Sequence, residues 1–257
     1  MISSDDLPEF VLFGDSLTEW SFDDKTQGFG LFLEQQYHGK AQIVNEGQAG
    51  YYTSTDLALD FDRIITRAVS PRAPPTLLFT IFLGANDACL VADNKEYVPL
   101  STFAANIRTF VETILTQDAL SATKIVLITP PPINRPTTKW GEKSDYAYKT
   151  YVSKRRYAEK IMQIAAEYGE TGRVVGLDYW GSLIDAALEV EGRGAEDQAV
   201  KYGEEKLPGC GLVGAKEFGE GWFTDGLHLD VKGYAVLSKG LMEVVVGKWP
   251  ELAPERL

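Results

Sequence analysis

The chain has 257 residues, of which 44% are hydrophobic and 24% charged, and its formal net charge is -12. This composition is typical of a globular protein with a sizeable core and argues against global disorder. The acidic balance disfavours phosphate backbones and anionic lipid, so neither a nucleic-acid partner nor membrane insertion is expected.

Short apolar runs alternate with longer amphipathic stretches along the chain. Runs rich in Val, Ile, Leu and Phe predict β-strands over 9–13, 41–45, 76–83, 124–129 and 173–178. Several of these runs lack clean alternation, which is typical of parallel strands covered on both faces. Apolar residues at helical spacing predict helices over 28–37, 54–69, 101–115, 144–169 and 231–245. Strand-helix repetition of this kind predicts a three-layer α/β fold.

Capping residues and breaks in the pattern refine this prediction. Ser101 or Thr102 is expected to cap the helix over 101–115. No linker divides the chain, so we expect one domain over residues 1–257. The segment 189–221 is rich in Gly, Glu and Lys and has little apolar periodicity. A loop of this length is either a solvated surface excursion or a lid over a site, and the sequence leaves both open.

The first residues, the apolar runs and the cysteines predict where the protein is located and whether its thiols are reduced. Residues 1–10 lack the basic stretch and apolar run of a signal peptide, and no apolar run is long enough to span a membrane. We therefore expect a cytoplasmic protein. Its two cysteines, Cys89 and Cys210, do not form a disulfide framework and are expected to be reduced. A homo-oligomer is left open.

Only two histidines are present, which limits the chemistry available to the chain. His38 stands at the end of a predicted helix, where an imidazole faces the negative end of the helix dipole, and is interpreted as structural. His228 follows Asp225 by three residues in WFTDGLHLD. A carboxylate at that spacing either orients an imidazole as a base or simply caps a turn beside a half-buried histidine.

Metal and nucleotide sites are not predicted. The chain has neither HExxH nor paired CxxC, and too few histidines for a zinc site. GCGLVG at 209–214 matches GxGxxG, but no strand precedes it and no βαβ unit follows, so we interpret it as a chance match. No metal or cofactor is expected. The SKRR run at 153–156 is interpreted as a small solvated basic patch.

Polar residues follow the first three predicted strands directly. Ser16 comes after the first, the glycines Gly47 and Gly50 after the second, and Asn86 after the third. The carboxyl ends of parallel strands share one edge of a sheet, where ligands bind. Each segment alone could be a cap or a turn. Together with His228, they would supply a nucleophile, a base and donors for an oxyanion.

Four short blocks resemble those of the SGNH (GDSL-type) hydrolases, in the family's order. They are GDSLT at 14–18, NEGQAG at 45–50, GAND at 84–87 and DGLH at 225–228. The resemblance implies a flavodoxin-like α/β/α fold with a five-stranded parallel sheet, and hydrolysis of esters or thioesters. By motif position, it implies Ser16 as nucleophile, His228 as general base and Asp225 as its partner.

The same resemblance implies an oxyanion hole and a branch of the family. The hole would consist of the backbone N–H groups of Ser16 and Gly50 and the side-chain amide of Asn86, while Asp15 and Asp87 would brace the loops. GFG after the first block and DGLHLDVKGY near the end are similar to the isoamyl acetate-hydrolysing esterases, which cleave short-chain esters. A small-molecule ester is therefore the expected substrate.

Other functions on the same scaffold remain open at this point. The alternatives are a lysophospholipase, a thioesterase or a carbohydrate deacetylase, because the 189–221 segment precedes the Asp225–His228 block and bears on substrate preference. A non-catalytic module that binds a small anion at the same edge would need neither Ser16 nor His228, and is disfavoured because both are present.

Overall fold

The computed structural model describes residues 7–90, 95–134, 145–203, 206–212 and 214–257. Its centre is a five-stranded sheet in the order β2-β1-β3-β4-β5, in which all neighbouring strands are parallel. The strands are β1 (Glu9–Gly14), β2 (Gln42–Gly47), β3 (Thr76–Phe82), β4 (Lys124–Ile128) and β5 (Val174–Leu177). The five predicted strands and the flavodoxin-like order are thereby confirmed.

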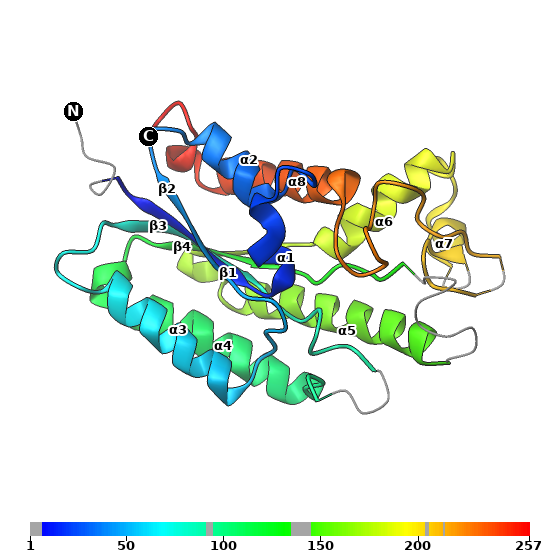
Figure 1. Ribbon diagram of the computed structural model, residues 1–257, viewed down its shortest axis with the longest axis horizontal. Helices are drawn as coiled ribbons and strands as arrows, with labels where there is room; N and C mark the ends of the chain where they lie inside the picture. The colour runs from blue at the N-terminus through cyan, green and yellow to red at the C-terminus, as the bar shows by residue number, and fades with distance from the viewer. Residues whose placement is uncertain (1–6, 91–94, 135–144, 204–205, 213) are drawn as a thin grey trace.

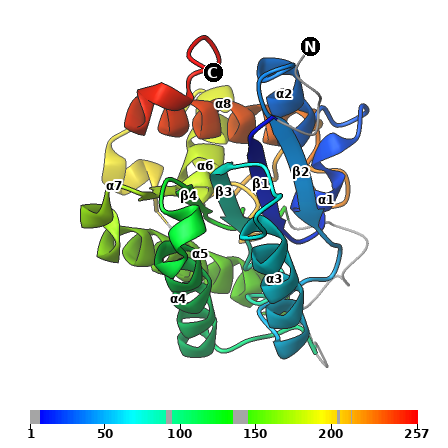
Figure 2. The ribbon, with the colours of Figure 1, turned by 90° about the vertical axis from the view of Figure 1, so that its left-hand side faces the viewer.

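Helices cover both faces of this sheet (Figure 1). One face carries α2 (Phe29–Gln36), α6 (Tyr179–Val190) and α8 (Val231–Lys248), and the other carries α3 (Thr55–Ala68), α4 (Leu100–Thr116) and α5 (Asp145–Glu167). Figure 2 shows the two helical layers edge-on, above and below the strands. The described residues also form two shorter α-helices, α1 (Ser16–Glu19) and α7 (Gln198–Lys201). The three-layer α/β/α prediction is confirmed.

The lack of alternation in the strands follows from this double cover. In β1, Phe10 and Leu12 pack into the core beneath α2, α6 and α8, whereas Val11 and Phe13 pack against α3, α4 and α5. All four side chains are completely buried. A strand buried on both faces has no position that favours a polar residue, so its sequence is a continuous apolar run.

Two local predictions differ from the structure. Helix α6 lies outside the predicted helices, although Asp178 caps it by accepting a hydrogen bond from the Gly181 N–H at 2.9 Å. Helix α4 begins at Leu100 after Pro99 and has no side-chain cap, so the expected cap at Ser101 or Thr102 is wrong. A proline in this place needs no hydrogen-bond partner for its nitrogen, and it sets the backbone direction before the first turn.

The segment 189–221 is more tightly anchored than its composition indicates. Its first two residues complete α6, and α7 lies within it. The side chains of Leu207, Cys210 and Phe218 are at most 5% exposed and join the core on the α6–α8 side. A fully solvated excursion is therefore wrong for these residues, while the lid stays a prediction. Residues 204, 205 and 213, like Ser144 at the predicted start of α5, lie outside the described residues.

The described part of the chain contains no helix long and apolar enough to cross a membrane. Neither Cys89 nor Cys210 forms a disulfide, as expected. The single domain and the cytoplasmic location stay predictions, and a homo-oligomer stays open.

Candidate active site

Ser16 lies at the point where β1 ends and α1 begins. Asp15 caps this helix: its Oδ1 accepts a hydrogen bond from the Leu17 N–H at 2.9 Å. The strand can turn this sharply because Gly14 has no side chain, and a Cβ there would lie 2.6 Å from the Phe82 carbonyl oxygen. Ser16 is 5% exposed, and it stands in the first turn, where backbone N–H groups have no helical acceptor.

His228 and Asp225 belong to a tight loop just before α8. An isolated antiparallel bridge pairs Phe223 with Leu229 and closes the loop. The Oδ1 atom of Asp225 accepts hydrogen bonds from the backbone N–H groups of Leu227 at 3.0 Å and His228 at 2.9 Å. This turn of the chain leaves Oδ2 facing the imidazole ring.

The structure brings Ser16, His228 and Asp225 into one chain of contacts. His228 Nε2 lies 3.1 Å from Ser16 Oγ, and His228 Nδ1 lies 2.7 Å from Asp225 Oδ2. Burial raises the pKa of Asp225, but the hydrogen bonds from the ring and from the two backbone N–H groups outweigh it and hold this pKa well below its usual range. Asp225 is therefore a carboxylate at neutral pH and accepts the Nδ1 proton, which leaves Nε2 free to accept the Ser16 hydroxyl proton.

The segments that follow β2 and β3 reach the same edge of the sheet as Ser16. Gly14 at the end of β1 is paired with Gly47 in β2 and with Phe82 in β3. The turn after β2 contains Gly50, whose φ of +82° lies in the left-handed region that favours glycine.

Asn86 joins this turn to the segment after β3. Its Nδ2 donates a hydrogen bond to the carbonyl oxygen of Tyr51, next to Gly50, at 2.8 Å. An amide nitrogen carries two hydrogens, so one remains for another acceptor. Asn86 is 8% exposed. The Gly50 and Asn86 segments are thereby held together at the carboxyl edge where Ser16 lies.

The two aspartates expected to brace the loops do so. Asp15 caps α1, while Asp87 Oδ1 accepts hydrogen bonds from both the backbone N–H and the hydroxyl of Thr53, at 2.8 and 2.6 Å. Both carboxyl groups are buried. Burial raises the pKa of Asp15 to about 7 and that of Asp87 to about 6.

Two residues near the site do not stand out in the sequence. The ring of Trp20 lies against the His228 ring, with centroids 4.3 Å apart, and it is 43% exposed. Its place one turn after the GDSLT block is the only available signal.

Lys154 is completely buried, so the interpretation of SKRR as a solvated patch is wrong for this residue. His38 is exposed in the turn after α2.

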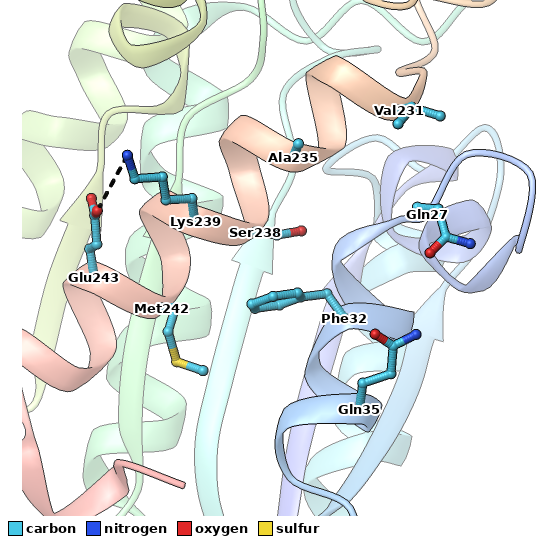
Figure 3. A pocket seen from close by; sticks show the side chains of 9 residues that line it. All are labelled: Gln27, Phe32, Gln35, Val231, Ala235, Ser238, Lys239, Met242 and Glu243. Carbon is cyan, nitrogen blue, oxygen red and sulfur yellow. Dashed lines mark ion pairs between the residues drawn. The ribbon is translucent and has the colours of Figure 1, made fainter.

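A separate groove of about 440 Å³ runs between α2 and α8, lined by Phe32, Ser238 and Met242 among others (Figure 3). The residues that line this groove do not include Ser16, His228 or Asp225. In the described ranges, no group of three or more His, Cys, Asp or Glu side chains is arranged to hold a metal ion.

Comparisons with known proteins show which family, relatives and solved fold the chain is similar to. The model of the GDSL-like Lipase/Acylhydrolase family matches residues 10–241. The chain is 32% identical to the isoamyl acetate-hydrolyzing esterase 1 homolog of Rattus norvegicus, over 63% of this chain and 64% of that protein. It is 30% identical to the isoamyl acetate-hydrolyzing esterase of Saccharomyces cerevisiae, over 98% and 92%. A solved acetylxylan esterase from Geobacillus stearothermophilus shares the fold, with a TM-score of 0.58 at 18% identity over 92% and 93%.

Proposed function

The chain belongs to the family of GDSL-like lipases and acylhydrolases, and we propose that it cleaves short-chain carboxylic esters, such as acetates of small alcohols, through an acyl-enzyme on Ser16. Its class, a carboxylic ester hydrolase, is that of the family and of its esterase-named relatives. The observation that carries the proposal is the contact chain from Ser16 Oγ through the His228 ring to Asp225 Oδ2, at 3.1 and 2.7 Å.

In this proposal the reaction runs in two acyl-transfer steps. Ser16 Oγ attacks the ester carbonyl carbon while His228 Nε2 takes the hydroxyl proton. The imidazolium that forms is stabilised by the Asp225 carboxylate on Nδ1, and it then protonates the departing alcohol oxygen. Water next donates a proton to Nε2 and attacks the acyl-enzyme, which releases the acid and restores the Ser16 hydroxyl.

The negative charge on the carbonyl oxygen needs donors that are already in place. We assign this role to the backbone N–H groups of Ser16 and Gly50 and to the Asn86 amide. Three features support the assignment. Ser16 is the first residue of α1, and the Asn86 amide is hydrogen-bonded to the carbonyl of Tyr51 in the Gly50 turn. Ser16, Gly50 and Asn86 also lie at the same edge of the sheet.

Asn86→Ala is expected to lower kcat for ester hydrolysis about 100- to 1,000-fold, the usual cost of removing one oxyanion donor. The fold should persist, because the turn after β2 is also held by the Gln48 N–H, which donates to the Gly14 carbonyl at 3.1 Å. Steady-state kinetics with p-nitrophenyl acetate would measure the loss. Asn106→Ala is a matched control, since Asn106 Nδ2 donates to the Thr53 carbonyl at 2.8 Å. Equal losses in both variants would contradict the role given to Asn86.

The acyl-chain preference is tested by comparing p-nitrophenyl esters from acetyl to decanoyl, together with isoamyl acetate. Because relatives from yeast and rat carry the name isoamyl acetate-hydrolyzing esterase, we expect kcat/KM to be highest for acetyl and to fall as the chain lengthens. A maximum at octanoyl or decanoyl would instead indicate a lipase or lysophospholipase. Acetylated xylo-oligosaccharides and acyl thioesters complete the panel, and a clear preference for either would replace the proposed substrate class.

A further inference from the structure

Lys154 is a charged residue in the interior that the mechanism above does not use. It lies in the middle of α5 with no exposed surface, and among the described residues its Nζ atom has no hydrogen-bond partner. One turn earlier, the hydroxyl of Thr150 accepts a hydrogen bond from the Leu90 N–H at 3.0 Å. This contact places the Lys154 region of α5 beside the segment after β3 that carries Asn86.

The carboxylate that Lys154 interacts with is the cap of the helix that begins at Ser16. Asp15 is 1% exposed, and its Oδ1 holds the Leu17 N–H. Its Oδ2 is buried without a hydrogen-bond partner among the described residues. The electrostatic neighbours of Asp15 include Lys154, which favours its charged form. A buried cation and a buried anion therefore lie within electrostatic range, next to the proposed nucleophile.

Other ionisable groups around this pair set its balance of charge. Asp87 opposes the charge on Asp15, whereas His228 favours it. Tyr234 on α8 also faces Asp15, and its hydroxyl donates to the Leu17 carbonyl at 2.8 Å. Cys89 is a further neighbour of Lys154. Lys154 thus supplies positive charge from α5 to a region that holds two buried carboxyl groups.

Each partner depends on the other for its charge near neutral pH. Burial raises the pKa of Asp15 to about 7, against the attraction of Lys154. Burial lowers the pKa of Lys154 to about 8, against the attraction of Cys89 and Asp15. Without the ammonium, the pKa of Asp15 would rise further, and its carboxyl group would be neutral at pH 7.

We propose that Lys154 is a positioning residue, whose buried ammonium keeps Asp15 a carboxylate so that the cap holds the first turn of α1 and the Ser16 hydroxyl in place. The inference rests on the proposed function, since it concerns the alignment of Ser16 for attack. A charged acceptor binds the Leu17 N–H more strongly than a protonated one and is favoured at a helix N-terminus. Loss of that charge should therefore loosen the turn that presents Ser16.

A double-mutant cycle of Lys154→Met and Asp15→Asn tests the inference through the pH profile of kcat/KM for p-nitrophenyl acetate. Lys154→Met should lower kcat/KM about fivefold at pH 7 and shift the acid limb upward by about one pH unit, because Asp15 loses an opposite charge. The variant and the wild type should converge at pH 9, where Lys154 is largely neutral in the wild type. With Asp15→Asn, which cannot ionise, adding Lys154→Met should change the remaining activity less than twofold at any pH.

Thermal unfolding of the wild type, the two single variants and the double variant from pH 4 to pH 9 reports the ionisation of Asp15 without requiring hydrolysis. The pKa of Asp15 in the folded protein, about 7, lies above its ordinary value of 3.8. Its contribution to stability is therefore fully present below pH 3.8 and is lost as the pH rises through 7. The difference in Tm between the wild type and Asp15→Asn should change over this same pH range. In the Lys154→Met background, the corresponding change in Tm should extend to higher pH.

Lys160→Met on the same helix, whose Nζ donates to Gln163 at 2.6 Å, is the matched control and should leave both profiles unchanged. In Lys154→Met below pH 7, where Asp15 is mostly protonated, replacing the buried ammonium by an apolar side chain is not expected to lower Tm. An unshifted acid limb in Lys154→Met, or an equal effect of Lys154→Met in the wild-type and Asp15→Asn backgrounds, would overturn the inference while leaving the esterase assignment intact. A wild type without esterase activity, but with Lys154-dependent Tm profiles, would contradict the proposed function and not the charge coupling.

Discussion

Ser16→Ala is expected to lower kcat for p-nitrophenyl acetate by roughly 10⁴- to 10⁶-fold, the range that removal of a nucleophile in such a contact chain produces. The variant retains the donors for the oxyanion but has no hydroxyl to form the acyl-enzyme. Its fold should be unchanged, because Ser16 Oγ contacts His228 Nε2 and loss of that single hydrogen bond leaves the cap on Asp15 intact. Steady-state kinetics and circular dichroism, run side by side, would measure both.

The control for this variant is Ser21→Ala, which removes another buried hydroxyl from the same region. Ser21 Oγ donates to the Thr18 carbonyl at 2.7 Å and does not contact His228 in the described structure. It should retain activity within a few-fold. A fluorophosphonate probe should label Ser16 in the wild type, as read by peptide mass spectrometry, and should not label Ser16→Ala. Wild-type turnover by Ser16→Ala would end the proposed mechanism.

Asp225→Asn is expected to lower kcat about 10⁴-fold at pH 7, because it reverses the proton arrangement of the imidazole. Asp225 Oδ2 accepts the Nδ1 proton of His228, at 2.7 Å. An asparagine can keep its carbonyl oxygen toward the backbone N–H groups of Leu227 and His228, which then turns its amide N–H₂ toward Nδ1. The ring must accept there and carry its proton on Nε2, where it can no longer take the proton of Ser16. Single-turnover acylation would measure the loss.

The pH dependence of this pair has a defined sign. Hydrogen bonds hold the pKa of Asp225 well below its usual range, so its contribution to stability is present above pH 3.8, its ordinary value, and is lost only as the pH falls below that value. Asp225 should therefore not contribute to an acid limb near neutral pH.

Asp230→Asn, which alters the neighbouring cap of α8, is the control for Asp225→Asn and should leave activity within a few-fold. Comparable losses in the two variants would mean that Asp225 acts only on the loop.

Strands β1, β3 and β4 can be predicted because each is buried in a run of consecutive residues, such as 10–13, and needs no distant information. The helices over 54–69 and 231–245 are equally clear, since their apolar spacing is local. Helix α6 escapes prediction although Asp178 provides a cap, because it follows β5 after a single residue and continues into a segment without apolar periodicity. Its boundary depends on how that segment packs.

The residues of the site likewise divide into those that the sequence predicts and those that it does not. Motif blocks place Ser16, Gly50 and Asn86 at one edge of the sheet, because parallel strands end on the same side. They do not place Trp20 against the His228 ring, nor Lys154 near Asp15. A lysine followed by two arginines is most often solvated, and no local pattern marks the one that faces inward.

The sequence by itself determined the five strands and the long helices other than α6, the cap of α1 and the turn that joins Asp225 to His228, because these depend on residues only a few positions apart. Only the tertiary structure decided that His228 meets Ser16, 212 residues earlier in the chain, and that Lys154 lies buried within electrostatic range of the nucleophile turn. The physical reason is that such contacts follow from the packing of whole helices against the sheet, which brings distant segments together and removes a charged group from water.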